Sequence, residues 1–322
     1  MIFKGMSKIA DSKFLVVLDL NGTLLARLGP TEESLYKKHP IFNSTSTESI
    51  NIPITKRPSP QSYIAFNNSW RPVVLRPHTV DFLRWLHQQD FALAFWTSCE
   101  AHNAKDLISR LLEHVNSSDK NIHGKDYEYK VSKDGDEIKP LFIWSRDKCQ
   151  LINPETFYSQ RKRELLASSK QETECKKTSS DSTDDSSSAD STIVPSTPSS
   201  CDTISDELES LMAKMNIASE KRQAGKYVKP IARKDMSLVW ETTFTTSSGQ
   251  RIQFSSENSV LLDDSMEKAV HPEQAIILRE FDPTDHAVDW TEDDELKAVM
   301  MKLKERQQQW LQQLDNSKES SN

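Results

Sequence analysis

Short apolar runs bounded by polar turns recur along the chain. Apolar residues are nearly continuous within each run, which is typical of strands that are covered on both faces of a sheet. The runs span residues 14–20, 91–96, 141–144, 259–262 and 275–278. Stretches with helical periodicity, chiefly 79–87 and 101–112, lie between them. This alternation predicts an α/β fold with a mostly parallel sheet.

Two segments interrupt this alternation. Residues 28–70 are rich in Ser, Thr, Asn and Pro and predict a loop or hairpin insertion over the strand ends. Residues 150–225 form a second insertion, whose part 168–205 is of low complexity, with 13 Ser, 6 Thr and no aromatic residue. Such a segment cannot bury enough apolar surface to offset the entropy of ordering it, so we expect it to be disordered.

A helix is predicted after the low-complexity segment, at 205–217. Ser205 could cap this helix. One face of the helix would carry Leu208, Leu211, Met212 and Met215. This apolar face could pack weakly on its own domain or bind a partner protein.

The C-terminal segment 282–322 carries the strongest helix signal, from Thr291 onward. Thr291 and Asp294 resemble a capping box. An apolar seam over 291–314 follows a 4-3-4-3-4 spacing through Leu296, Met300, Leu303, Gln307, Trp310 and Leu314. This seam could pack on its own domain or form a short coiled coil with a partner.

Composition and charge narrow the possible functions. The net charge of −7 lies mainly in the segments 168–205 (−4) and 281–322 (−5), which leaves about +2 for the rest. No basic block indicates direct nucleic-acid binding. No signal peptide, transit peptide or membrane-spanning run is seen. The four cysteines have no C-x-x-C spacing and indicate reduced thiols, so we expect a nuclear or cytoplasmic protein.

Polar residues stand where the predicted strands end. Ligands of open parallel sheets bind at the carboxyl ends of the strands. Carboxylate oxygens suit Mg²⁺, and hydroxyl and backbone N–H groups at a strand-to-helix turn can hold phosphoryl oxygens. The strand ends read Asp19-Leu20-Asn21-Gly22-Thr23, Thr97-Ser98, Ser145-Arg146-Asp147 and Asp263-Asp264-Ser265. Together they indicate a site for a metal ion and a phosphate group.

The order of these motifs resembles the haloacid dehalogenase superfamily, in the branch of the RNA polymerase carboxy-terminal-domain phosphatases (the FCP-homology or NLI-interacting-factor-like domain). The matching stretches are LVVLDLNGTL, VVLRPHTVDFLRWL, ALAFWTSCEAHNA, PLFIWSRDKC, ARKDMSLVW and NSVLLDDSMEKAVHPEQAI. The resemblance covers residues 13–148 and 226–281 as one discontinuous Rossmannoid domain. It implies that the insertion 150–225 interrupts this domain.

By this resemblance, Asp19 is the nucleophile that accepts the phosphoryl group and is also a ligand of Mg²⁺. Asp264 is a direct or water-mediated Mg²⁺ ligand, and Asp263 supports it. The backbone carbonyl of Asn21 is a further Mg²⁺ ligand.

The resemblance also implies which residues hold the phosphoryl oxygens. These are Thr97, Ser98 and Lys234. Lys229 is a weaker candidate for this lysine, because Lys234-Asp235 fits the motif better.

Asn21 departs from the motif. In active family members this residue is an acid, which protonates the departing alkoxide and then deprotonates the water that opens the aspartyl-phosphate. An amide has no proton to exchange near neutral pH, and positioned acid–base catalysis contributes ~10²–10⁴-fold. Asp147 is one candidate for a substitute acid.

Two functions remain open. The first is a Mg²⁺-dependent phosphatase for phosphoserine or phosphothreonine in proteins, slowed by Asn21. The second is a pseudophosphatase or scaffold that binds a phosphorylated or acidic protein segment. The mitochondrial inner-membrane translocase subunit built on this domain is a non-catalytic use of the same fold.

Overall fold

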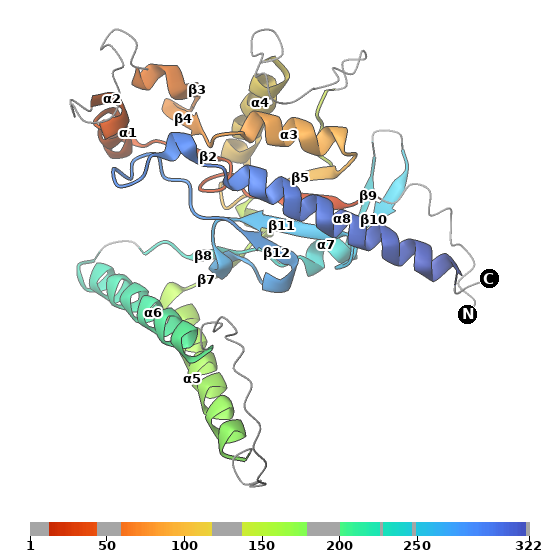
Figure 1. Ribbon diagram of the computed structural model, residues 1–322. Coiled ribbons are helices and arrows are strands. Elements are labelled where there is room, and N and C mark those ends of the chain that lie inside the picture. Colours follow the sequence, from red (N-terminus) through yellow and green to blue (C-terminus); the bar gives the residue numbers. More distant parts are fainter. Residues whose placement is uncertain are drawn as a thin grey trace, which may run out of the picture. The chain divides into compact units, whose positions relative to one another are not determined.

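Figure 1 shows the computed structural model, which describes residues 13–43, 59–117, 137–178, 200–225, 228–246 and 249–319. The chain divides into two compact units. The first comprises Met1–Cys149 and Arg233–Asn322, and the second comprises Gln150–Ala232. Among the described residues, no helix is both long enough and apolar enough to cross a membrane.

A five-stranded parallel sheet forms the centre of the first unit (Figure 1). Its spatial order is β12-β11-β1-β5-β6, and every neighbouring pair is parallel. The strands are β1 (Leu15–Leu18), β5 (Ala92–Trp96), β6 (Ile143–Trp144), β11 (Ser259–Asp263) and β12 (Ala275–Ile277). These are the five strands that the apolar runs predicted, so the α/β fold with a parallel sheet is confirmed.

The sheet is covered on both faces. Val16 and Leu18 of β1 point into one apolar cluster, and Leu15 and Val17 point into another. The first cluster contains side chains of α3 (Thr79–Gln88), α4 (Ala101–Ser117) and α8 (Glu295–Glu319). The second contains side chains of α7 (Ser237–Glu241), β9 (Thr243–Thr245) and β10 (Arg251–Gln253). This two-sided burial explains why β1 is apolar at every position.

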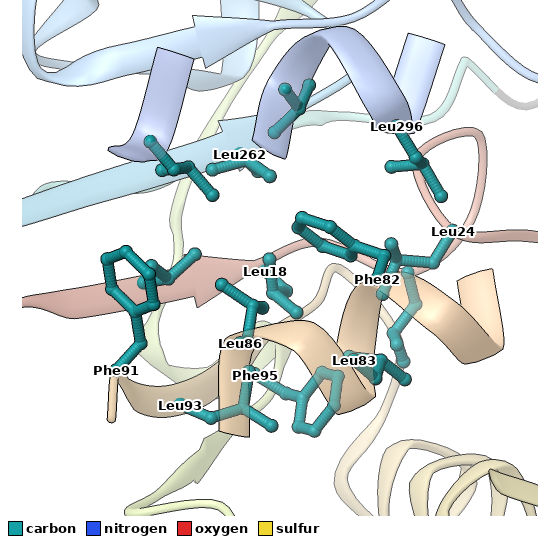
Figure 2. Close-up of a cluster of buried hydrophobic side chains, with 14 of the residues drawn as sticks. Leu18, Leu24, Phe82, Leu83, Leu86, Phe91, Leu93, Phe95, Leu262 and Leu296 are labelled. Carbon is teal, nitrogen blue, oxygen red and sulfur yellow. The ribbon is translucent and has the colours of Figure 1, made fainter. Parts of the chain in front are cut away.

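The C-terminal helix α8 packs on its own domain. Leu296, Leu303 and Trp310 of the predicted seam are buried in the first cluster. Figure 2 shows Leu296 facing this cluster together with Leu18, Leu262 and Phe82. The Trp310 ring meets the Phe14 ring edge-on, with centroids 5.9 Å apart. Of the two alternatives for this seam, intramolecular packing is the one observed.

The predicted start of this helix is wrong. Thr291 lies in the separate 3-10 turn Trp290–Glu292, and α8 begins at Glu295. The backbone N–H of Glu295 donates to Oδ1 of Asp293 at 2.9 Å. Asp293 therefore satisfies an N–H group at the helix start, the role that the sequence assigned to Thr291.

The insertion 28–70, predicted as a loop or hairpin, contains the first strand of a hairpin and short helices. β3 (Ile64–Asn68) and β4 (Arg71–Leu75) form a hairpin, which joins β2 (Leu25–Arg27) in an antiparallel sheet of order β2-β4-β3. Residues 44–58 lie outside the described residues. The part before them contains α1 (Pro30–Lys37) and α2 (Pro40–Asn43), and η3 (Pro60–Tyr63) follows.

Helix α1 was not expected from the sequence. Pro30 occupies its first turn, and the Glu32 carboxylate accepts a hydrogen bond from the Gly29 N–H at 2.5 Å. Tyr36 is buried in an aromatic cluster with Phe42 and Trp290. This tertiary burial, which the local sequence does not reveal, holds the short helix in place.

The second unit contains a helix pair. β7 (Gln150–Ile152) pairs with β8 (Ile231–Arg233), and α5 (Pro154–Thr178) packs against α6 (Ser200–Gln223). Leu211 of α6 is buried against Tyr158 and Leu165 of α5. The predicted helix 205–217 is thus the middle of a longer one. Of its predicted apolar face, Leu211 and Met215 pack within the unit, whereas Met212 is exposed.

Two details of this insertion differ from the sequence prediction. Ser205 lies inside α6, which begins at Ser200, so it does not cap the helix. The two ends of the low-complexity segment, 168–178 and 200–205, are helical. Its middle, 179–199, lies outside the described residues.

A buried arginine, Arg76, connects three segments of the first unit beside the sheet. The Arg76 guanidinium donates to Oδ2 of Asp293 at 2.9 and 3.1 Å. It also donates to the carbonyl oxygens of Thr23 at 3.1 Å and Arg279 at 2.9 Å. Both members of the ion pair are almost completely buried. Arg76 therefore fixes the loop after β1 against the start of α8.

We expect Arg76→Met to lower the free energy of unfolding by about 3–5 kcal/mol, because it leaves the buried Asp293 charge with only the exposed Arg279, whose Nη2 lies 3.5 Å away. Chemical denaturation monitored by circular dichroism would measure this change. The matched control is Arg71→Met, at an exposed position of β4, which should change stability by no more than about 0.5 kcal/mol. Equal effects of the two substitutions would contradict this account of Arg76.

Candidate active site

Side chains from three neighbouring strands meet at the carboxyl edge of the parallel sheet. Asp19 follows β1, Thr97 follows β5, and Asp263 is the last residue of β11. β1 lies between β5 and β11, and the three strands run in the same direction. Asp19 is therefore central in the site, and all three side chains are buried.

The Lys234 ammonium group lies between two of the carboxylates. Its Nζ is 2.9 Å from Oδ1 of Asp19 and donates to Oδ2 of Asp263 at 2.6 Å. Lys234 has no exposed surface, and a buried charge is tolerated only when it is paired. Lys229, the weaker candidate for this role, is exposed.

The two aspartates have pKa shifts in opposite directions. Burial raises the pKa of a carboxyl group. At Asp19, Lys234 and Lys268 outweigh burial and lower the pKa, so the side chain is a carboxylate at neutral pH. At Asp263, burial outweighs the effect of Lys234 and, helped by the Asp19 charge, raises the pKa to about 6. Asp19 is therefore the more readily ionised of the two.

Lys234 stays protonated despite its burial. Burial alone would lower the pKa of this amine. The charges of Asp19 and Asp263 outweigh burial, so that the pKa of Lys234 is raised. The site thus keeps a fixed positive charge beside Asp19.

Three carboxylates form a set of oxygen donors. Asp19, Asp263 and Asp264 each present an oxygen, and these oxygens lie within 4.8 Å of one another. Within the described part of the chain, the buried Oδ1 of Asp19 accepts no hydrogen bond, although it is paired with Lys234. All-oxygen donor sets with free acceptor capacity suit Mg²⁺.

Lys268 is a site residue that sequence reasoning missed. It ends the 3-10 turn Met266–Lys268. Its Nζ lies 2.6 Å from Oδ1 of Asp264 and 3.4 Å from oxygens of both Asp19 and Asp263. The only signal in the sequence is its position four residues after Asp264. That spacing predicts a contact on an α-helix, whereas Lys268 lies in a 3-10 turn.

Gly22 allows the loop after β1 to lie close to the Asp264 side chain. Its φ is +82°, in the region that favours glycine. A Cβ atom at this position would lie 2.5 Å from Oδ2 of Asp264. The Gly22 carbonyl also accepts a hydrogen bond from the Phe281 N–H at 2.7 Å. The glycine is thus required both by the backbone angle and by the nearby Asp264 side chain.

The loop after β5 contains the two hydroxyls expected to hold phosphoryl oxygens. The Thr97 hydroxyl is buried and accepts from the Cys99 N–H at 3.3 Å. Ser98 is half-buried, and its carbonyl accepts from Nε of Arg146 at 2.8 Å. Arg146 follows β6, so the end of the neighbouring strand fixes this loop.

The Asn21 side chain faces the same loop. Its Nδ2 donates to Sγ of Cys99 at 3.3 Å, and Cys99 is a buried free thiol. Asn21, which stands where the resembled family has an acid, is therefore oriented by a hydrogen bond to a sulfur atom. The contact of Cys99 with Asn21 was not predicted, because no cysteine spacing in the sequence indicates a role for Cys99.

Asp147, the candidate substitute acid, is exposed and accepts a hydrogen bond from the Ser145 hydroxyl. Within the described ranges, no hydrogen bond or ion pair joins it to Asp19 or to Asn21. It is therefore not part of the cluster in this structure.

We expect Gly22→Ala to lower the free energy of unfolding by more than the ~1–2 kcal/mol that a left-handed alanine costs, because the new methyl group also collides with Asp264. Gly249→Ala is the matched control, since Gly249 has the same φ of +82° but no atom of the described residues lies within 4 Å of the added Cβ. Urea denaturation of both variants would measure the difference. If the two variants lose equal stability, Gly22 is not packed against Asp264.

Comparisons with known proteins found a family match for part of the chain. Residues 14–156 match the family model of the NLI interacting factor-like phosphatases. A comparison with curated proteins found no match.

Seven chains of solved structures match as well, and two of them are structures of Fcp1. One is Fcp1, described as an essential RNA polymerase II CTD phosphatase, with 11% identity and a TM-score of 0.32; the alignment covers 94% of this chain and 53% of that chain. The other is a fission yeast Fcp1 variant bound to beryllium fluoride, with 10% identity, a TM-score of 0.31, and coverage of 94% and 51%. The chain thus spans about half the length of these structures. Residues 14–156 are thus similar to the NLI interacting factor-like phosphatases, the family whose motifs the sequence resembles.

Proposed function

We propose that the chain is a Mg²⁺-dependent, phosphatase-like protein in which Asp19 accepts a phosphoryl group. The observation that carries this proposal is the state of Asp19: a buried carboxylate at a strand end, with a lowered pKa and two lysines in contact. An ionised carboxylate on a rigid strand end can attack phosphorus.

The first step makes one bond and breaks another. A carboxylate oxygen of Asp19 bonds to phosphorus, and the bond from phosphorus to the substrate oxygen breaks. Lys234, Thr97 and Ser98 hold the phosphoryl oxygens, whose negative charge a positive group in a buried site stabilises strongly. The products are an aspartyl-phosphate and an alkoxide that needs a proton.

The carboxylate cluster fits a divalent cation. Asp19, Asp263 and Asp264 would hold Mg²⁺ together with the backbone carbonyl of Asn21. When bound, Mg²⁺ would neutralise charge on the phosphoryl oxygens and orient them. Asp263 would also fix Lys234 through its hydrogen bond.

Asn21 limits both proton transfers. The amide donates to Cys99 and has no proton to release near neutral pH. An alkoxide such as that of serine therefore departs without an acid, and the aspartyl-phosphate is opened without a base. The loss amounts to about 10²–10⁴-fold in rate.

The substrate we propose is phosphoserine or phosphothreonine in a protein segment, in the nucleus or cytoplasm. The second candidate function is a pseudophosphatase that binds a phosphorylated or acidic segment without turnover. The Asn21–Cys99 contact favours this second candidate, because it leaves the phosphate-binding groups intact while supplying no acid.

The proposal predicts strong selectivity for the leaving group. The value of kcat/KM for an aryl phosphate should exceed that for a phosphoserine peptide by about 10²-fold or more, because an aryl oxide departs without a proton. Phosphate release from both substrates would measure this ratio. Asn21→Asp should raise only the phosphoserine value, by about 10²–10⁴-fold.

Asp19→Asn is the control, since it should abolish release from both substrates. Equal kcat/KM values for the two substrates in the unmodified chain would show that Asn21 does not limit the reaction. Release that persists in Asp19→Asn would exclude Asp19 as the nucleophile. Absence of release, with phosphopeptide binding retained, would favour the pseudophosphatase.

A further inference from the structure

The Lys268 ammonium group contacts every carboxylate of the donor set. Its Nζ is 2.6 Å from Oδ1 of Asp264, 3.4 Å from Oδ2 of Asp19 and 3.4 Å from Oδ1 of Asp263. A metal ion bound by all three carboxylates would have to lie near the position that the Lys268 ammonium group occupies. Lys268 therefore already supplies a positive charge to these oxygens.

Mg²⁺ and this ammonium group cannot use the same oxygens together. Mg²⁺ binds oxygen at about 2.0–2.1 Å and demands near-octahedral geometry. An ion at that distance from the Asp264 carboxylate would stand close to Nζ of Lys268. Two cations so close in a partly buried site repel each other strongly. Binding of the metal thus requires the ammonium group to move.

Lys268 is the lysine that can move. Its side chain is 22% exposed, whereas that of Lys234 is 0% exposed. It has a flexible four-carbon stem and lies in a short turn rather than on a strand. The Lys268 carbonyl accepts a hydrogen bond from the Lys234 N–H at 2.6 Å, which holds its backbone while the side chain swings outward.

The charge of the cluster supports the same exchange. Three carboxylates and two ammonium groups leave one negative charge when all are ionised. If Lys268 withdraws, two negative charges remain, which match one divalent cation. Lys234 then stays beside Asp19 as the fixed positive group.

We propose that Lys268 is a built-in cation that occupies the divalent-metal position and competes with Mg²⁺. This inference rests on the proposed function in one respect, namely that the carboxylate cluster takes a divalent cation. The metal-free cluster then carries only one net negative charge without an ion, and the affinity for Mg²⁺ is set by the displacement of Lys268.

Calorimetric titration of the full chain with MgCl₂, and separately with MnCl₂, tests this competition without any activity measurement. Lys268→Met removes the charge but keeps a long side chain, and should lower the Mg²⁺ dissociation constant about tenfold or more. Lys268→Arg keeps the charge and should bind the metal as weakly as the unmodified chain. The matched control is Lys304→Met, on an exposed face of α8, which should leave the dissociation constant unchanged.

Thermal unfolding gives a second readout. Without metal, Lys268→Met should melt at a lower temperature than the unmodified chain, because its carboxylates repel one another. Excess MgCl₂ should raise its melting temperature by more than it raises that of the unmodified chain.

Three outcomes are decisive. If Lys268→Met and the unmodified chain bind Mg²⁺ equally, or if the variant binds more weakly, the competition is excluded while the metal site stands. If only the variant binds, Lys268 fully replaces the metal in the unmodified chain and the proposal is supported. If neither binds Mg²⁺ or Mn²⁺, the metal part of the proposed function fails and this inference fails with it.

Discussion

The pairing of the buried Lys234 ammonium with Asp19 and Asp263 is the interaction on which the site depends. An unpaired charge at this depth would be costly, so the strand ends that bear the two aspartates must stay together around it. The backbone secures the lysine as well, since Lys234 exchanges hydrogen bonds with Lys268 and Val270. The same charge keeps Asp19 ionised, which links the stability of the site to its reactivity.

On the proposed function, the site has the groups that accept a phosphoryl group and lacks the residue that would protonate the leaving alkoxide and activate water. Asp19, Lys234 and Thr97 lie at the sheet edge as phosphoryl transfer requires. Asn21 instead donates to Cys99 and can neither protonate an alkoxide nor activate water. Lys268 adds a second restriction, because it occupies the carboxylates that a metal ion would use. Both restrictions act on turnover and leave the fold intact.

The sequence predicted those features of the fold that depend on local pattern. The five parallel strands were predictable because each lies in a nearly continuous apolar run, which burial on both faces explains for β1 and β11. Asp19 and Asp263 were predictable because they end such strands. Helix α1 was not, since the tertiary burial of Tyr36 holds it. The contacts of Lys268 and Cys99 could not be foreseen either, because both side chains reach the site from turns whose geometry no periodicity encodes.

The central claim is that Asp19 accepts a phosphoryl group that the chain then releases slowly. Acid quenching after mixing with an aryl phosphate and Mg²⁺, followed by peptide mass spectrometry, tests it most directly. The account predicts that phosphate accumulates on Asp19, because an aryl group departs without an acid whereas opening of the aspartyl-phosphate lacks its base. Phosphate on another residue, or turnover without any covalent phosphate, would contradict it.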